Sequence, residues 1–247
     1  ALVRGLANNI PSNVRLIENC PVLKIKSGRT IKITTSSGEI TTDKLVLATN
    51  YEAPKIGFLK RRVLGSTLSG SFTRILTPQE LATLGSHESW GIISLHSGGA
   101  TLRLTSDGRI SLRNTAEYNG GALLSPQALK RRQITHRNSF EKRFPQLAEV
   151  PFEFAWSGVE GISRNDTNFF GQQSKNIFLA GGYNGSGVSR GTAFGYALAE
   201  YAGGGQSELI TDCLRSKAAT WLPPRPFLDL GAMLKIKSRF QGAGLDR

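Results

Sequence analysis

Residues 176–205, NIFLAGGYNGSGVSRGTAFGYALAEYAGGG, decide the fold. The apolar run 177–180 predicts a buried strand, the glycines after it predict a tight loop, and the small residues of 192–202 predict a closely packed helix. At such a junction the backbone N–H groups at the start of the helix face outward and can meet an anion or a polar ring. The segment is therefore typical of proteins that hold a phosphate or a cofactor ring against a glycine loop.

A serine hydrolase is the first alternative, because residues 187–191 match the G-x-S-x-G motif around a nucleophilic serine, here Ser189. In that fold the catalytic histidine follows the serine in the chain. The histidines of this sequence all precede it: His87, His96 and His136. This order argues against a serine hydrolase.

A nicotinamide dinucleotide site is the second alternative. Gly185, Gly187 and Gly191 approach the G-x-G-x-x-G fingerprint, but one residue too many stands before the last glycine. The fingerprint also needs a following strand that carries an acid for the ribose, whereas Asp212 lies in a stretch with a helical pattern. A simpler interpretation, in which the glycines only allow close packing of the helix, stays open.

The rest of the chain is mostly β in character. Residues 13–50 predict a β-meander that ends in a buried strand, and residues 90–114 predict a hairpin ribbon with a turn at Asp107-Gly108. One solid helix is expected between Ser125, its N-cap, and Pro145. From about residue 216 onward, the proline and glycine content argues against a long helix.

Composition limits the class of protein. The chain has 247 residues, 39% of them hydrophobic, which excludes a disordered or fibrous protein. It contains no apolar run of the length that a membrane helix needs and no signal-peptide pattern at its start, so we expect a cytoplasmic location. Cys20 and Cys213 stand too far apart for a zinc motif, and no metal site is expected.

The net charge of +13 supports an alternative of a different class, a basic module that binds nucleic acid or an acidic surface without catalysis. Its carriers would be the clusters 60–62 and 130–132. The basic residues are dispersed along the chain, however, and no signature of a nucleic-acid-binding fold is present. We therefore expect no nucleic-acid partner.

Four segments, in order, resemble the D-amino-acid-oxidase-like family of FAD-dependent oxidoreductases, which includes glycine and sarcosine oxidases. Besides the glycine segment, they are residues 1–50 with the strand end ATN, the strand pair 102–114, and the crossover FEFAWSGVEGISRNDTNFFG at 152–171. The tail LPPRPFLDLG, 222–231, is similar to the γ-glutamylputrescine-oxidase-like branch. The resemblance covers nearly the whole chain.

The resemblance implies a fold of the mixed α+β and α/β class. A partial FAD-binding domain of the glutathione-reductase-like type, with a β-meander, would combine with a mostly antiparallel β substrate domain that carries a long helix. The expected division is 1–54 and 156–220 for the FAD-binding domain, 55–155 for the substrate domain and 221–247 for a carboxy-terminal tail.

The resemblance also implies where FAD would lie. Backbone N–H groups of residues 183–189 would face the pyrimidine edge of the flavin ring and stabilise the negative charge that develops there during reduction. The crossover segment has no cysteine or histidine for a covalent link, so FAD would be non-covalent. The implied cofactor-binding residues are Val22, Ala48, Thr49, Asn50, Gly158, Gly182, Tyr183, Asn184, Gly185, Ser186, Gly187, Val188 and Ser189.

The substrate implied by the resemblance is a small amine or amino acid, oxidised at its C–N bond to an imine by hydride transfer to the flavin. Some relatives hold the substrate carboxylate with an arginine of the crossover, where this chain has Gly161 in VEGIS. This difference favours a polyamine-like amine, unless an arginine elsewhere replaces it. The expected substrate-binding residues are Arg103, Arg109, Trp156 and Tyr183, with Arg164 as a further candidate, and no catalytic side chain is assigned.

Members of the family open with a βαβ unit that carries G-x-G-x-x-G, and these 247 residues contain no counterpart of it. The resemblance therefore implies that the chain is the later portion of such an enzyme and that its partner is a missing amino-terminal half. On this interpretation the chain alone binds FAD poorly or not at all.

Overall fold

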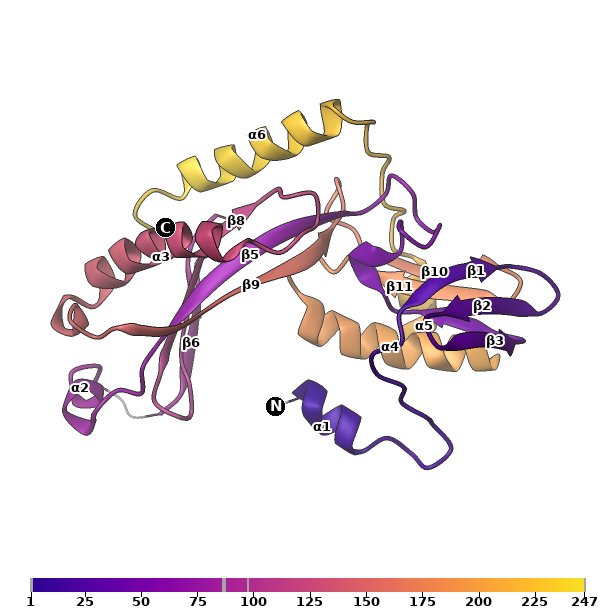
Figure 1. The fold of residues 1–247 in the computed structure, drawn as a ribbon, viewed down its shortest axis with the longest axis horizontal. Helices are drawn as coiled ribbons and strands as arrows, with labels where there is room; N and C mark the ends of the chain where they lie inside the picture. Colours follow the sequence, from indigo (N-terminus) through magenta and orange to yellow (C-terminus); the bar gives the residue numbers. More distant parts are fainter. Residues whose placement is uncertain (1, 86–87, 97, 247) are drawn as a thin grey trace.

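The computed structural model describes residues 2–85, 88–96 and 98–246. Its strands form three sheets: a meander β1-β2-β3, a small sheet β10-β11-β4 and a five-stranded sheet β6-β7-β8-β5-β9 (Figure 1). The fold is of the mixed α/β class that the sequence predicts.

The meander consists of short antiparallel strands near the start of the chain. They are β1 (Val22–Lys26), β2 (Ile31–Thr35) and β3 (Gly38–Thr42). In β2, Ile31 and Ile33 are buried and alternate with polar residues, which is the pattern of a strand with one face on a core. The predicted meander is confirmed. The strand expected to be buried at its end, β4 (Leu45–Leu47), lies instead at the edge of the second sheet, and only Leu47 of its three residues is buried.

The small sheet contains the decisive segment. Its strands are β10 (Phe169–Ser174), β11 (Ile177–Gly181) and β4 (Leu45–Leu47), and β11 pairs in parallel with β4 and antiparallel with β10. Every residue of β11 is buried. The helix α4 (Gly187–Gly203) follows directly and packs on β11, and α5 (Glu208–Leu214) packs on α4. The predicted strand, glycine loop and helix are confirmed.

The largest sheet holds the middle of the chain. Its strands are β6 (Trp90–Ile93), β7 (Thr101–Leu104), β8 (Ile110–Glu117), β5 (Leu64–Thr73) and β9 (Phe152–Ile162). The long strands β5 and β9 pair along their whole length and reach toward the glycine segment (Figure 1). The predicted hairpin turn is present, since Gly108 takes a φ of 80° at the tip between β7 and β8.

One face of this sheet is covered by α3 (Pro126–Arg143). The helix begins where the sequence predicts, because the Ser125 hydroxyl accepts a hydrogen bond from the Ala128 N–H. Its buried Phe140 packs into a core with Leu102, Leu104 and Leu112 of the sheet. We call this side the α3 face. A short helix, α2 (Pro78–Ala82), and three 3-10 turns complete the middle and end of the chain: η1 (Asn50–Glu52), η2 (Pro145–Leu147) and η3 (Gly244–Asp246).

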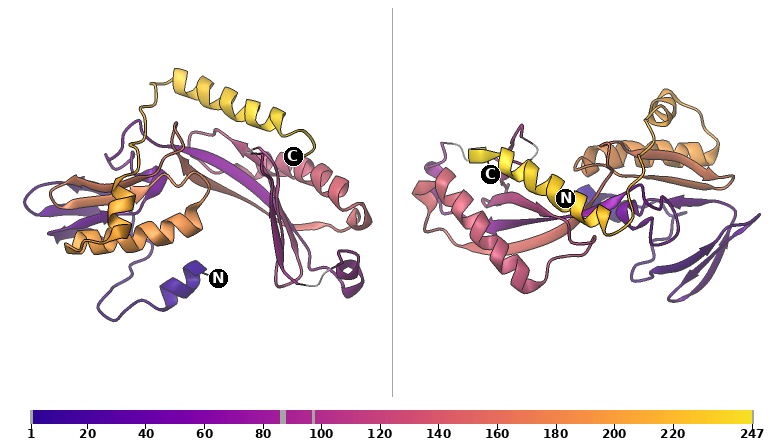
Figure 2. Two further views of the ribbon diagram at one scale, coloured as in Figure 1. Left: turned by 180° about the vertical axis from the view of Figure 1, so that it is seen from behind. Right: turned by 90° about the horizontal axis from the view of Figure 1, so that it is seen from above.

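The end of the chain corrects one prediction. Residues Phe227–Gly242 form a long helix, α6, although the prolines and glycines of the tail argued against one. Three prolines cluster between 223 and 226, ahead of the first helical turn, so they do not interrupt its backbone hydrogen bonds. The helix runs beside the five-stranded sheet, and the first helix, α1 (Leu2–Asn8), lies apart with no buried residue (Figure 2).

Candidate functional site

The glycine loop after β11 has a backbone that other residues rarely adopt. Gly182 and Gly185 take φ values of 68° and 89°, in the left-handed region. A Cβ on Gly182 would also come within 3.0 Å of the Phe169 ring. The loop therefore needs glycine at these positions, and it leaves its backbone bare for a ligand.

Two asparagines fix the loop in place. The Asn50 side-chain oxygen, just after β4, accepts a hydrogen bond of 2.8 Å from the Gly182 N–H. Asn184 accepts a bond of 2.9 Å from the Ser163 N–H through its side chain, and its own N–H donates to the Gly161 carbonyl. The loop is thus tied both to the end of β4 and to the end of β9.

The first turn of α4 has free donors. Its N-cap residue, Ser186, makes no side-chain capping bond. The N–H groups of Gly187, Val188 and Ser189 stand in the first turn, where a helix supplies no acceptor of its own. The helix dipole adds positive potential at the same point, so the turn suits an anionic or strongly polar group.

Tyr183 lies along the first turns of α4. Its ring makes an edge contact with Phe194 at 5.9 Å, and a Cβ on Gly191 would stand 3.6 Å from it. The pKa of the Tyr183 hydroxyl is raised because of burial. The residue is half-buried against the helix, which places it beside the loop.

The face of the large sheet opposite α3 carries a second set of predicted residues. The register pairs Gly70 with Trp156, Leu68 with Gly158 and Ser66 with Glu160, so the alternate residues 156, 158 and 160 of β9 share this face. A Cβ on Gly70 would come within 3.0 Å of the Trp156 ring. The indole therefore packs closely against a glycine of the neighbouring strand.

Two residues of opposite charge that the sequence does not mark, Arg113 and Glu160, lie on the same opposite face without forming an ion pair. Arg113 of β8 pairs in register with Gly70 and donates a hydrogen bond of 2.6 Å to the Thr101 hydroxyl. Burial lowers the pKa of the Arg113 guanidinium and raises the pKa of the Glu160 carboxyl. The attraction between their opposite charges opposes both shifts. No sequence motif marks Arg113, because its position depends on the register of β8 against β5 and on a bulge beside it.

The predicted arginines are scattered. Arg103 pairs in register with Ser111 in the ribbon and so falls on the same face as Arg113. Arg109 lies at the far tip, where it forms ion pairs with Asp107 and Glu153. The structure therefore does not bring Arg109 to the glycine loop.

The residues predicted for the adenine side lie near the sheet edges. Val22 is the first residue of β1 and is 41% exposed, and Ala48 and Thr49 are exposed after β4. Val46 of β4 is also exposed, because β4 ends the small sheet on this side. Asn50 differs from them, since it holds the loop and faces Gly161.

The histidines required by the serine-hydrolase alternative lie elsewhere. His136 is a completely buried residue of α3, and its ring nitrogens bond to the hydroxyls of Ser71 and Thr115 on the sheet. His96 lies at the end of the β6–β7 ribbon, and His87 is outside the described residues. The Ser189 hydroxyl bonds weakly to the Ser186 carbonyl at 3.5 Å.

The clusters behind the nucleic-acid alternative are partly engaged within the chain. Arg61 stacks on the Trp221 ring at 4.4 Å, and Arg62 donates to the Ala219 carbonyl. Arg132 forms a two-pronged pair with Glu117. These contacts use the basic groups to hold the fold.

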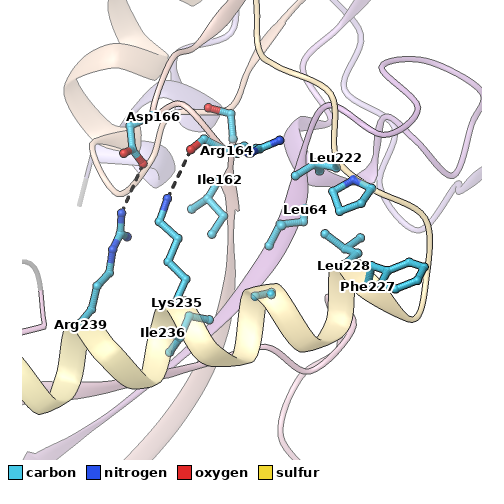
Figure 3. Close-up of a pocket in the computed structure, with 14 residues that line it drawn as sticks. Leu64, Ile162, Arg164, Asp166, Leu222, Phe227, Leu228, Lys235, Ile236 and Arg239 are labelled. Carbon is cyan, nitrogen blue, oxygen red and sulfur yellow. Dashed lines mark hydrogen bonds and ion pairs between the residues drawn. The ribbon is translucent and has the colours of Figure 1, made fainter.

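A cavity of about 460 Å³ lies between α6 and the ends of β5 and β9. Leu64, Ile162 and Phe227 contribute to its apolar walls (Figure 3). On its rim Lys235 donates to the Arg164 carbonyl, and Arg239 pairs with Asp166 at 3.6 Å. The side chain of Arg164 thus lines a cavity under α6.

A buried strand that runs into a glycine loop and an uncapped helix, beside an antiparallel sheet with polar residues, defines a cofactor-binding α/β protein. The comparisons give the family. Residues 1–201 match the family described as FAD dependent oxidoreductase, and the chain belongs to that family. The site fits FAD, since Gly182 and Gly185 carry no side chain that would meet a ring and the first-turn N–H groups of α4 are free to donate.

Individual relatives agree with this assignment. The chain is 29% identical over 218 residues to a probable oxidoreductase OrdL of Rhizobium meliloti. The aligned region covers 84% of this chain and 47% of that protein. Glycine oxidase from Geobacillus kaustophilus has a similar fold, with a TM-score of 0.65, 15% identity, and coverage of 78% of this chain and 50% of its own. L-proline dehydrogenase from P. horikoshii gives a TM-score of 0.66, 21% identity, and coverage of 81% and 54%. The chain thus spans about half the length of these proteins.

Within the part of the chain that the structure describes, the helices are all too short or too polar to cross a membrane.

Proposed function

We propose that the protein to which this chain belongs oxidises the C–N bond of a small amine or amino acid to an imine. The observation that carries the proposal is the bare glycine loop and uncapped start of α4, facing the end of β9. FAD, when bound, supplies the hydride acceptor. The proteins with similar folds, glycine oxidase and L-proline dehydrogenase, support an amine or amino-acid substrate.

The residues of this chain would act by binding and electrostatics. The N–H groups of Gly187, Val188 and Ser189 would donate to the pyrimidine edge of the ring and stabilise negative charge there. Trp156 and Tyr183 would wall the substrate space and exclude water. Val22, Ala48 and Thr49 would contact the adenosine half of FAD. Gly158, which has no side chain, would leave room near the flavin ring. FAD would be held non-covalently.

We also propose that the FAD site is completed by chain outside these 247 residues. The exposed edge of β4, with Val46 45% exposed, offers unpaired backbone groups to a further parallel strand. The division into an FAD-binding domain of 1–54 and 156–220, a substrate domain of 55–155 and a tail of 221–247 belongs to the same proposal.

Anaerobic reduction tests the proposal. The protein, purified with its flavin, is mixed under nitrogen with a panel of primary amines, diamines and D- and L-amino acids. We expect the visible flavin absorbance to bleach with at least one of them and to return when oxygen or an artificial electron acceptor is added. A flavoprotein that no amine or amino acid bleaches would contradict the proposed reaction.

A further inference from the structure

Glu160 of β9 lies closer to the glycine loop than Trp156, the predicted substrate residue on the same strand. Its Oε2 atom lies where a Cβ on Gly185 would be only 3.3 Å away. Glu160 shares the face opposite α3 with Trp156, as the register with Ser66 and Gly70 shows. The adjacent Gly161, which the sequence analysis set in the place of an arginine, faces Asn50 instead.

Within residues 2–85, 88–96 and 98–246, the Glu160 carboxylate has no direct counter-charge. Among the residues that the structure describes, none donates a hydrogen bond to this carboxylate or forms an ion pair with it, and only the charges of Arg113 and Arg239 act on it from a distance. Burial disfavours the charged form, so the pKa of the Glu160 carboxyl is raised. A partly buried carboxylate in this state is stabilised when a cation with N–H donors comes against it.

An aromatic ring stands on the same face as this carboxylate. Trp156 stands two residues before Glu160 on the same face, with its indole against Gly70, and an aromatic ring attracts positive charge. The free N–H groups of the α4 first turn begin two residues after Gly185. The carboxylate therefore stands between an aromatic wall and the proposed position of the flavin ring.

We propose that Glu160 binds a positively charged nitrogen of the substrate, so that this site selects cationic amines over amino acids held by their carboxylate. The inference rests on the proposed function and names its substrate class. In this proposal the crossover strand β9 supplies a carboxylate, that of Glu160, to the positively charged nitrogen of the substrate.

Direct binding tests it. The affinity of the full-length protein, purified with its flavin, for 1,4-diaminobutane and for glycine is measured by calorimetry under nitrogen. We expect the diamine to bind more tightly than glycine. Glu160→Gln is expected to weaken diamine binding at least tenfold while glycine binding changes little, Glu160→Asp to retain part of the affinity, and Glu160→Arg to reverse the preference toward glycine.

Glu39→Gln is the matched control, because Glu39 is an exposed carboxylate on β3. Equal diamine affinity in the wild type, the control and Glu160→Gln, with all three folded by circular dichroism, would overturn the inference, as would a wild type that prefers glycine. The proposed function is judged separately by flavin bleaching. If an amine bleaches the flavin and the Glu160→Gln variant binds the diamine as well as the wild type does, the proposed function stands and this inference is refuted. If the diamine binds through Glu160 but never bleaches the flavin, the cation-binding role stands and the proposed oxidation is refuted.

Discussion

The two faces of the five-stranded sheet are built from the same strands and differ in almost every other respect. On the α3 face, Ile110, Leu112 and Phe140 are 0% exposed, and the buried hydroxyls and His136 bond to one another. On the opposite face, Trp156 lies on a glycine and Glu160 has no counter-ion among the described residues. Strand alternation thus separates a face that stabilises the fold from a face that is available to a ligand.

The largest expected effect comes from the α3 face. Phe140→Ala should lower the free energy of unfolding by about 3–5 kcal/mol, because it removes a fully buried ring that contacts Phe144 and Phe152. Phe154→Ala, at a ring that is 52% exposed on the opposite face, should cost less than about 1 kcal/mol. Urea unfolding followed by circular dichroism measures both. Similar losses of unfolding free energy in the two variants would contradict the difference between the two faces of the sheet.

The buried histidine gives the next effect, which depends on pH. Burial lowers the pKa of His136 to about 4, from 6.5, so the folded state favours the neutral ring. The unfolded chain takes up the proton first, so stability is complete above pH 6.5 and falls by about 3 kcal/mol as the pH drops to 4. Unfolding curves at several pH values should show this loss in the wild type and not in His136→Gln. Parallel pH dependence of the two proteins would contradict the account.

The smallest expected change in stability concerns the glycine loop and separates folding from binding. Gly182→Ala places a side chain at a φ of 68°, which costs about 1–3 kcal/mol, and its Cβ would crowd the Phe169 ring. We expect a modest loss of stability together with at least a tenfold weaker affinity for FAD in a fluorescence titration of the full-length protein freed of its flavin. Gly203→Ala, with no atom within 4 Å of its new Cβ, is the control and should keep FAD affinity. If both variants bind FAD alike, the loop is not the site.

Local pattern explains what the sequence could predict. The strand 177–181 and the helix that follows were predictable because an apolar run, glycines and small residues succeed one another within a short segment. The same holds for α3, whose Ser125 cap and Pro145 stop are local signals. The tail was mispredicted because its prolines precede α6 and do not fall within it.

The rest of the site depends on contacts between distant strands. Glu160 reaches the glycine loop only because β9 pairs with β5 in one register and the loop is tied to the end of β9 by Asn184. Arg113 falls on the same face through its pairing beside a bulge in β8. A one-residue shift in either pairing would turn these side chains to the other face, and no spacing in the sequence fixes it.

The most direct test of the central claim, that the loop after β11 and the first turn of α4 hold FAD, is amide hydrogen exchange with and without excess FAD. The experiment uses the full-length protein, in which the N–H groups of Gly187, Val188 and Ser189 lack helical acceptors and should exchange rapidly without FAD. The account predicts that FAD slows exchange in residues 182–190 more than in α3. Unchanged exchange in 182–190 at saturating FAD, or protection confined to another part of the chain, would contradict it.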